Sequence, residues 1–469
     1  MFLNIDQQKK SSPALVDNEG TRITYGELAE KMVEVGRNVE PRSVIFILCK
    51  NTVGAMIGYL GFIENEAVPL NLSEKIDEAL LNDLLDAYTP AYLWVPNEDT
   101  EKFTFETVCA AFGYTLLKTG NDIYPVHDKL QFLMTTSGST GSPKLVRYKK
   151  GNLEANAKNA AIAFGWSEKE RPVCDLGMQY TMGLNVINSH LYVGATVLLT
   201  TYNLMSGEFW DYIKAERATN FTGVPFSYDI LYRLRFERMD LPDLMTISEG
   251  GGKLTDERFI QLAEYAQRTG KRFIASFGTT ETSARVACLP AELALTKTGS
   301  IGRAIPEGEL FLIDSDGSVL TDPVAEGELC YKGPNVTMGY AVCREDLLKD
   351  DEFKGEYHTG DLARRDEDGC YFVTGRLSRF LKLLSYRVSL DQSERLIQQE
   401  FGIECACSGT DQRMNVYITD ESKKNEVLKF ISAKTNLYNS LFKVFVVDEL
   451  LRNDSGKIRY KDMDAKYAG

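Results

Sequence analysis

The chain has 469 residues, of which 43% are hydrophobic and 26% are charged. This length exceeds what one hydrophobic core usually supports, so we expect two to four domains or subdomains. The 53 Lys and Arg residues stand against 67 Asp and Glu residues, which gives a formal net charge of −14. An acidic balance offers no broad electrostatic attraction for nucleic acid or an anionic membrane, so no nucleic-acid partner is expected.

The N-terminal residues lack the charged, apolar and small-residue regions of a signal peptide, and no apolar run reaches membrane-spanning length. The nine cysteines are scattered, several of them inside apolar stretches. Cys405 and Cys407 have the wrong spacing for a zinc knuckle, and no histidine lies near them. These features predict a cytoplasmic protein with reduced thiols and without a structural metal.

Short apolar runs alternate with amphipathic stretches between about residues 22 and 300. The predicted strands are residues 44–49, 67–70, 91–95, 130–134, 195–199, 220–222, 246–248 and 272–276. The predicted helices are residues 25–35, 52–63, 152–163, 182–192, 227–234 and 256–269. This alternation predicts an α/β fold with doubly wound parallel sheets covered by helices.

After about residue 300 the pattern changes to short strands separated by Gly and Asp turns, at residues 309–313, 327–332 and 369–374. This pattern predicts an antiparallel, β-barrel-like portion over about residues 300–377. The remaining residues predict helices at 391–400 and 423–433 and a strand at 443–447, a small α+β domain. We therefore expect a large domain over residues 1–377 and a small one over residues 378–469, without a flexible linker between them.

A loop rich in hydroxyl side chains follows the predicted strand at residues 130–134 and reads Thr136-Ser137-Gly138-Ser139-Thr140-Gly141 before Lys144. Glycine lets backbone N–H groups approach an anion, hydroxyl groups donate further hydrogen bonds, and lysine supplies positive charge. Pro143 stands where the common P-loop requires its second glycine, so the P-loop pattern fails. The loop alone indicates either a phosphate site or a solvated turn.

Four further segments carry polar residues that folding alone does not require: residues 249–253, 277–281, 357–361 and 453–458. The first two directly follow predicted strands, where glycine also lets a flat ring lie against bare backbone. Each segment taken singly is more typical of a strand-end turn, a helix cap or a surface turn than of a functional site. Among the three histidines, His190 lies in an apolar stretch and is predicted to pack in the core.

Taken in chain order, residues 136–144, 277–281 and 357–361, the stretch from Gly375-Arg376 to Glu394, and residues 455–457 closely resemble the AMP-forming adenylating superfamily. This superfamily includes acyl- and aryl-CoA ligases, peptide-synthetase adenylation domains and luciferases. The resemblance covers nearly the whole chain. It implies that a carboxylate attacks the α-phosphate of ATP, that pyrophosphate leaves, and that the acyl group then passes to a thiol. It also implies a small, mobile C-terminal domain that rotates about Ser378.

The resemblance implies roles for individual residues. The catalytic residues would be Lys457, Glu281 and Thr280, with Lys457 bridging the carboxylate, the α-phosphate and the ribose, and Glu281 holding Mg²⁺. Asp361 would accept hydrogen bonds from the ribose hydroxyls, beside Arg376. The other nucleotide-binding residues would be Thr136, Ser137, Gly138, Ser139, Thr140, Gly141 and Lys144 at the phosphates, and Gly251, Gly252, Phe277, Gly278 and Thr279 around the adenosine.

The resemblance places the acyl pocket at Tyr180, Thr181, Met182, Asn185 and Phe226. Peptide-synthetase adenylation domains carry an aspartate for the substrate ammonium at the position of Thr181. The missing charge favours a simple carboxylic acid without an α-ammonium group. Core packing is an alternative interpretation of Met182.

Three positions depart from the superfamily pattern: Leu145 after Lys144, Ser378 at the hinge and Ser385 near the expected thiol tunnel. They leave open a nucleotide-binding partner protein without turnover, as an alternative to an enzyme. No carrier domain follows Lys457, so a separate acceptor is expected. Coenzyme A is favoured, and a free-standing acyl carrier protein is the alternative.

Overall fold

A computed structural model describes residues 1–135, 144–377, 379–384, 386–435, 437–453 and 456–468. The chain forms two compact units. The first consists of Met1–Leu310 and Tyr331–Tyr357, and the second of Phe311–Cys330 and His358–Gly469. Each unit is described by itself.

The first unit contains an eight-stranded sheet in the order β19-β9-β8-β4-β3-β5-β7-β6. Its strands are β3 (Val44–Cys49), β4 (Val68–Ser73), β5 (Tyr92–Pro96), β6 (Glu106–Ala111), β7 (Tyr114–Lys118), β8 (Leu130–Thr135), β9 (Leu145–Lys149) and β19 (Tyr340–Ala341). The four central strands β8, β4, β3 and β5 are parallel, and the outer strands pair antiparallel. The accompanying helices are α1 (Tyr25–Gly36), α2 (Val53–Glu64) and α3 (Glu78–Tyr88). Helix α2 is apolar and buried all round, as a helix inside a core must be.

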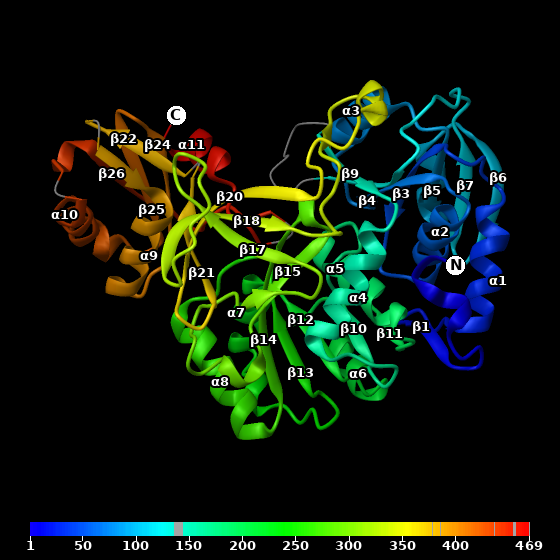
Figure 1. Ribbon diagram of the computed structural model, residues 1–469, viewed down its shortest axis with the longest axis horizontal. Coiled ribbons are helices and arrows are strands. Elements are labelled where there is room, and N and C mark those ends of the chain that lie inside the picture. Colours follow the sequence, from blue (N-terminus) through cyan, green and yellow to red (C-terminus); the bar gives the residue numbers. More distant parts are fainter. Residues whose placement is uncertain (136–143, 378, 385, 436, 454–455, 469) are drawn as a thin grey trace. The chain divides into compact units, whose positions relative to one another are not determined.

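The first unit also contains a nine-stranded sheet in the order β16-β15-β14-β13-β12-β10-β11-β1-β2. Its strands are β1 (Pro13–Asp17), β2 (Arg22–Thr24), β10 (Pro172–Cys174), β11 (Val197–Leu199), β12 (Asn220–Gly223), β13 (Thr246–Glu249), β14 (Arg272–Thr279), β15 (Ala284–Cys288) and β16 (Arg303–Ala304). The run from β1 to β14 is parallel. The helices that belong to it are α4 (Asn152–Phe164), α5 (Thr181–Tyr192), α6 (Gly207–Ala215), α7 (Pro225–Arg233) and α8 (Asp256–Thr269), seen in Figure 1.

Helices cover both faces of the nine-stranded sheet. The Thr222 hydroxyl lies within hydrogen-bond distance of Arg285, whose guanidinium also donates to Asn185 of α5. A Cβ on the next residue, Gly223, would instead meet the Tyr228 ring of α7 at 2.9 Å. Because neighbouring residues of a strand point to opposite faces, α5 and α7 lie on opposite faces. This is the doubly wound arrangement that the sequence predicts.

Most residues of a four-stranded sheet belong to the second unit. Its order is β17-β18-β20-β21, formed by β17 (Glu309–Ile313), β18 (Ala325–Lys332), β20 (Glu356–Arg365) and β21 (Tyr371–Arg376). The order ends at β17 and β21, so the expected barrel-like portion is an open sheet in the described part of the chain. The remaining elements of the second unit are β22 (Phe380–Leu383), β23 (Tyr386–Ser389), α9 (Leu390–Phe401), β24 (Cys405–Thr410), β25 (Arg413–Ile418), α10 (Lys424–Thr435), β26 (Phe442–Val446) and α11 (Tyr460–Tyr467). Strands β24, β25 and β26 share an apolar core with α9 and α10, for example Ile397, Val416 and Val427.

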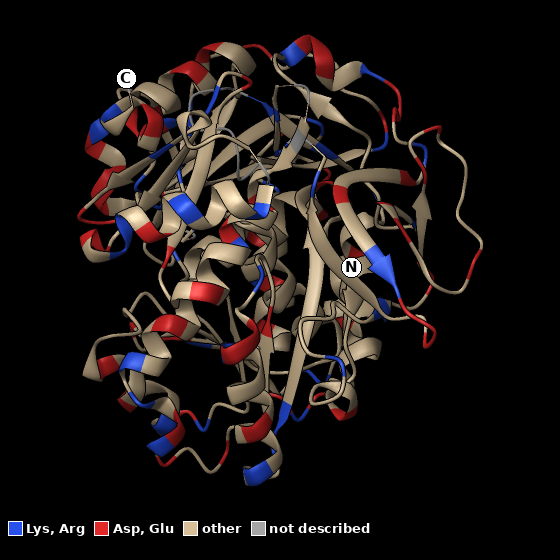
Figure 2. Cartoon of the chain, turned by 90° about the vertical axis from the view of Figure 1, so that its left-hand side faces the viewer, with Lys and Arg blue, Asp and Glu red and all other residues tan. Residues whose placement is uncertain are grey.

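The prediction of an α/β fold is confirmed, and several elements have the predicted bounds, including β3, β17 and α8. All nine cysteines are free thiols, and seven of them are buried. None of the described helices combines the length and the hydropathy needed to cross a membrane. Figure 2 shows acidic and basic residues interspersed along the same helices and loops.

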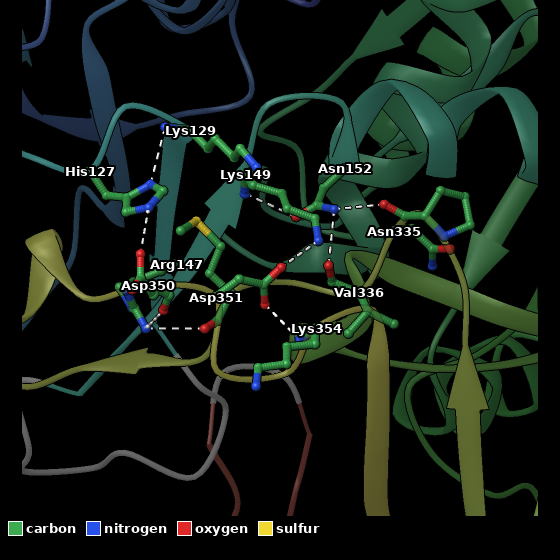
Figure 3. Close-up of polar contacts among 12 residues, drawn as sticks. His127, Lys129, Arg147, Lys149, Asn152, Asn335, Val336, Asp350, Asp351 and Lys354 are labelled. Atoms are coloured by element: carbon green, nitrogen blue, oxygen red, sulfur yellow. Dashed lines mark hydrogen bonds and ion pairs between the residues drawn. The ribbon is translucent and has the colours of Figure 1, made fainter.

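A buried arginine fastens β9 to the segment that contains β19. Arg147 is fully buried and donates to Glu352 Oε2 at 2.7 Å, to the Met338 carbonyl at 3.0 Å, and to the carbonyls of Asp350 and Lys349. Around this Arg147 clamp, Lys149 pairs with Asp351 at 2.6 Å and Asn152 donates to the Val336 carbonyl at 3.0 Å (Figure 3). The same segment is therefore held to β9 and α4 at several points.

We predict that Arg147→Ala lowers the free energy of unfolding of the first unit by about 3–5 kcal/mol, because it takes away the donor that three backbone carbonyls and Glu352 share and leaves a cavity where a fully buried side chain stood. Lys149→Ala on the same strand is the matched control, and its partly exposed ion pair is worth about 1 kcal/mol or less. Urea unfolding followed by tryptophan fluorescence measures both, since all three tryptophans lie in the first unit. Equal losses of unfolding free energy in the two variants would contradict the stabilising role of the Arg147 clamp.

Candidate functional site

Strand β14 ends in a tight turn that carries Thr280 and Glu281. A Cβ on Gly278 would lie 1.4 Å from the Ala284 carbonyl oxygen, so only glycine lets β14 and β15 approach this closely. The Thr279 N–H donates to Thr282 Oγ1 at 3.2 Å, inside the one-turn 3-10 helix Thr280–Thr282. Asn335 donates to the Thr282 carbonyl at 2.7 Å and ties the turn to the segment held by the Arg147 clamp. The turn is therefore held by a hydrogen bond between Thr279 and Thr282 and by the hydrogen bond from Asn335.

Glu281, Tyr340 and Lys144 come together although they lie far apart in the sequence. The Tyr340 hydroxyl donates to Glu281 Oε1 at 2.7 Å, and the Lys144 ammonium lies 3.5 Å from the centre of the Tyr340 ring. Burial, together with the Glu281 carboxylate, raises the pKa of Tyr340, so its hydroxyl stays a proton donor. The cluster therefore contains one carboxylate, which contacts the tyrosine hydroxyl, and one ammonium group, which lies over the tyrosine ring.

Two tyrosines of this region were missed from the sequence. Tyr340 lies on β19, and the fully buried Tyr148 of β9 donates to the Thr280 carbonyl at 2.7 Å. The backbone of Glu281 is also held, because its carbonyl accepts from the Thr337 N–H at 2.9 Å. Tyrosines inside apolar strands resemble core residues, so nothing in their local sequence distinguished them.

The glycine run after β13 allows close packing against two helices. Gly251 has a φ of +80°, which glycine adopts without strain. A Cβ on Gly250 would lie 2.3 Å from Met182 Cε, and one on Gly252 would lie 2.9 Å from Pro225 Cγ. The run thus lies between the first residues of α5 and of α7. Phe277, at the end of the neighbouring strand β14, is partly buried.

Two of the five predicted pocket residues line a small cavity, Thr181 and Asn185. Its other lining residues are Met134, Tyr148, Leu153, Asn156, Leu184, Asn188 and Ser283. The remaining three predicted residues are not among those that line it: Tyr180 is the N-cap residue of α5, Met182 packs beside Gly250, and Phe226 is exposed at the start of α7. The cavity is therefore lined mainly by polar and apolar residues of α4 and α5, together with Met134 near the end of β8 and Tyr148 near the end of β9.

In the second unit, Asp361 of β20 faces Arg376 of β21. The two residues are register partners, and Arg376 Nε donates to Asp361 Oδ1 at 2.7 Å. Burial raises the pKa of Asp361, while the charges of Arg376 and Lys457 oppose that shift. The guanidinium thus helps keep a buried carboxylate ionised, which makes Asp361 a hydrogen-bond acceptor.

Lys457 belongs to the electrostatic surroundings of Asp361. It is exposed, and its backbone N–H donates to Asn453 Oδ1 at 2.9 Å, while its carbonyl accepts from the Asn453 N–H at 2.9 Å. These two hydrogen bonds join Lys457 to Asn453 and leave the Lys457 side chain exposed. The residues Thr136, Ser137, Gly138, Ser139, Thr140, Gly141, Ser378 and Ser385 lie outside the described residues.

Arg379 anchors the residues that follow Arg376. It contacts Glu394 at 2.7 Å and Asp391 at 2.9 Å, and lies over the Tyr460 ring at 3.7 Å. Glu394, singled out by the resemblance, also accepts from the Cys407 N–H at 2.6 Å. This network joins α9 to β24 and to Tyr460, the first residue of α11, which follows Lys457 by three residues.

His190 is buried, as the sequence predicts. Its Nδ1 lies 2.7 Å from the Val186 carbonyl, its Nε2 lies 2.9 Å from the Asn220 amide nitrogen, and its ring packs on Trp166 at 4.0 Å. Burial, with a smaller contribution from the Arg285 charge, lowers the pKa of His190 to about 3. The imidazole is therefore neutral and structural.

The fold and the site together define a nucleotide-dependent adenylate-forming enzyme. The features that define it are the two helix-covered sheets, the polar turns directly after their strands, and the α+β unit with the turn that carries Lys457. The chain belongs to the family of AMP-binding enzymes, whose model matches residues 3–341.

Relatives and solved structures agree with this assignment. A 2-succinylbenzoate–CoA ligase of Bacillus thuringiensis subsp. konkukian is 30% identical over 470 residues, covering 96% of this chain and 94% of the relative. One from Bacillus cereus is 26% identical with the same coverage. The fold matches Bacillus subtilis o-succinylbenzoate CoA synthetase (MenE) in complex with the acyl-adenylate intermediate, with a TM-score of 0.79 at 22% identity over 98% of this chain and 97% of the other. It also matches ATP-bound MatB from Rhodopseudomonas palustris, with a TM-score of 0.77 at 20% identity over 99% of each chain. The chain is an AMP-forming ligase that joins a carboxylic acid to a thiol.

We predict that the first unit loses stability on mild acidification through His190. The histidine pKa is about 6.5 in the unfolded chain and about 3 in the folded one, so below pH 6.5 the unfolded state binds the extra proton. The stability is complete above pH 6.5 and falls toward pH 3, by about 2 kcal/mol at pH 5. Urea unfolding of the wild type and of His190→Gln at pH 7.5, 6 and 5 measures the difference. Parallel pH profiles would refute this assignment.

Proposed function

We propose that this ligase activates its acid as an acyl adenylate and then passes the acyl group to coenzyme A. A carboxylate oxygen of the acid attacks the α-phosphorus of ATP, and the bond to the bridging oxygen breaks, so pyrophosphate leaves with the electron pair. The thiolate sulfur then attacks the acyl carbonyl carbon, and AMP leaves. The observation that carries this proposal is the cluster of Lys144, Tyr340 and Glu281 at the end of β14.

The phosphate side of ATP is assigned to Lys144, with residues Thr136 to Gly141 before it, and the α-phosphate to Thr280. Both half-reactions move negative charge onto phosphate oxygens, so a positive charge held nearby stabilises the transition state. Glu281 would hold Mg²⁺, and its carboxylate fits this group because oxygen ligands suit a hard cation. Bound Mg²⁺ would neutralise phosphate charge. The Tyr340 hydroxyl, held at 2.7 Å, orients that carboxylate.

The nucleoside is assigned to two sets of residues. Gly251, Gly252 and Phe277 would form the adenine wall, and glycine without a Cβ lets a flat ring lie against the backbone. Gly278 and Thr279 would be further nucleotide-binding residues. Asp361 would accept hydrogen bonds from the ribose hydroxyls. Arg376 supports this role because it holds the buried carboxylate in its ionised form.

Lys457 is assigned to the acid carboxylate and the α-phosphate. An ammonium about 4 Å from developing negative charge contributes roughly 4 kcal/mol at an intermediate effective dielectric. Residues 378–469 would form a mobile small domain on the larger domain of residues 1–377, with Ser378 as the hinge. The structure supports a rigid small domain through the network of Arg379, which fixes α9 and α11.

The acid is assigned to a pocket at Thr181 and Asn185, together with Tyr180, Met182 and Phe226. Thr181 brings no charge for an α-ammonium, which supports a simple carboxylic acid. The acid named in the relatives, 2-succinylbenzoate, is the first one to test. A free-standing acyl carrier protein in place of coenzyme A is the alternative outcome of the same assay. The nine free thiols support a cytoplasmic location.

Exchange of labelled pyrophosphate into ATP, run with a panel of carboxylic acids, tests the first half-reaction. We expect exchange that depends on the acid, and with coenzyme A one thioester formed per AMP released. AMP release without a thioester would overturn the assignment of coenzyme A. Wild-type protein that exchanges with none of the acids would overturn the proposed activity.

We predict that Lys457→Ala lowers acid-dependent exchange by about 10²- to 10³-fold, since it removes one charge from the transition state. Lys461→Ala is the matched control, because Lys461 is an exposed lysine four residues further along and its loss leaves the rate unchanged. Initial exchange rates at saturating ATP measure both. A Lys457→Ala protein with the wild-type rate would show that the lysine lies outside the reaction.

A further inference from the structure

Arg285 of β15 is a fully buried arginine whose guanidinium meets only neutral acceptors among the described residues. It donates to Asn185 Oδ1, to Ser276 Oγ at 3.4 Å and to Thr222 Oγ1 at 3.5 Å. The last two contacts are at the upper limit of hydrogen-bond distance, so the fork of donors is poorly satisfied. A buried charge is costly unless a counter-ion or several good hydrogen bonds stabilise it.

The Arg147 clamp provides the comparison within the same unit. Both arginines are fully buried, but Arg147 pairs with Glu352 and three backbone carbonyls. Arg285 instead lies 4.6 Å and 5.2 Å from the centres of the Phe164 and Trp166 rings. Aromatic faces attract a cation, but they do not cancel its charge.

Among the described residues, neither Glu249 nor Asp175, two acids of the first unit, forms an ion pair with Arg285, and neither is among the charges that shift its pKa. Glu249 follows Ser248, whose hydroxyl meets Thr222 at 2.8 Å on the face of Arg285, so the Glu249 side chain points to the opposite face. Burial raises the pKa of Glu249 well above its usual range and that of Asp175 to about 7. Burial lowers the pKa of Arg285 to about 10, with opposing contributions from Cys288 and Tyr228, so the guanidinium stays charged at neutral pH.

The partners of Arg285 border the predicted acyl pocket. Asn185 accepts from Arg285 and also lines the small cavity beside Thr181. A Cβ on Gly250 would lie 2.3 Å from Met182 Cε and 2.8 Å from Ser276 Oγ, which places Ser276 next to Met182. Asn156, a further cavity residue, donates to the Arg285 carbonyl at 2.7 Å and accepts from Asn185 at 2.6 Å. Arg285 therefore lies directly behind the polar wall of the pocket.

We propose that Arg285 binds a second anionic group, a carboxylate, of the acid substrate, at the end remote from the carboxyl group that is adenylated. This inference rests on the proposed function and names its substrate class, dicarboxylic acids. A guanidinium group can donate two parallel hydrogen bonds to one carboxylate. The contacts of Arg285 to Ser276 and Thr222 are long, so replacing them requires little free energy. The bound carboxylate would supply the counter-ion that Arg285 does not find among the described residues.

Matched acids test this specificity in the exchange assay. Each dicarboxylic acid is compared with its monoamide, and 2-succinylbenzoate with 4-oxo-4-phenylbutanoate, so each pair differs by one negative charge. We expect the wild type to favour the diacid of at least one pair by about 10²-fold or more in kcat/KM, and Arg285→Gln to remove that preference, chiefly through KM. Arg285→Lys should restore part of the preference, because it restores the charge without the fork. An unchanged preference in Arg285→Gln would overturn the proposal, as would an equal loss for both members of every pair.

A second variant keeps the test informative if Arg285→Gln does not fold. Asn185→Asp places a carboxylate on the group that already accepts from Arg285. We expect this variant to be at least as thermally stable as the wild type and to lose the preference for the diacid, since the counter-ion is now internal. A variant that is more stable yet still prefers the diacid would contradict the proposal.

Binding without turnover separates this inference from the proposed function. The wild-type melting temperature should rise with a preferred diacid and not with its monoamide, and the difference should vanish in Arg285→Gln. This result without any pyrophosphate exchange would support Arg285 as a carboxylate site and refute the ligase activity. Exchange with no difference between diacid and monoamide in either assay would refute the Arg285 site alone.

Discussion

The candidate site of the first unit depends on one buried arginine. The Arg147 side chain is removed from water, and its two terminal nitrogens donate to the segment that includes Met338 and Glu352. These hydrogen bonds hold the segment against β9. Tyr340 lies within it, and for that reason its hydroxyl reaches Glu281 and its ring faces Lys144. A structural interaction thus sets the distance between groups that come from three separate parts of the chain.

Much of the fold could be predicted, because the central elements have the simplest patterns. Strand β3 is buried on both faces and reads as a continuous apolar run, and α8 begins at a Thr255 cap and ends at Gly270. The missed elements have patterns that tertiary packing overrides. Strand β15 contains the charged Arg285 in a fully buried run, and most residues of the edge strand β6 are exposed. Each pairs antiparallel with a strand next to it in the sequence, β15 with β14 and β6 with β7, so pairing defines these strands more than their own apolar pattern does.

The residues of the candidate site also divide into those that the sequence indicated and those that it did not. Glu281 and Asp361 are singled out by the resemblance, and their roles stay predictions. Glu281 comes shortly after the apolar strand β14, whereas Asp361 lies within β20. The partner of Asp361 is set by the register of β20 and β21, which pairs it with Arg376. Tyr148 and Tyr340 could not be predicted, since their role depends on which turn lies beside them in space. The hydroxyl-rich loop at residues 136–141 lies outside the described residues, so its phosphate role stays a prediction.

Arg147 and Arg285 show how the partners of a buried arginine distinguish a structural role from a role in substrate binding. An arginine that serves only the fold gains most when the chain supplies its counter-ion, as Glu352 does for Arg147. At Arg285 a single change, Asn185 to aspartate, would supply that counter-ion, yet the chain has an amide there. The amide leaves the guanidinium charged and incompletely bonded beside a cavity, a state that is unfavourable for folding alone. Such a state is favourable when an anion arrives with the substrate, because the unpaired charge then contributes to binding and to the choice of acid.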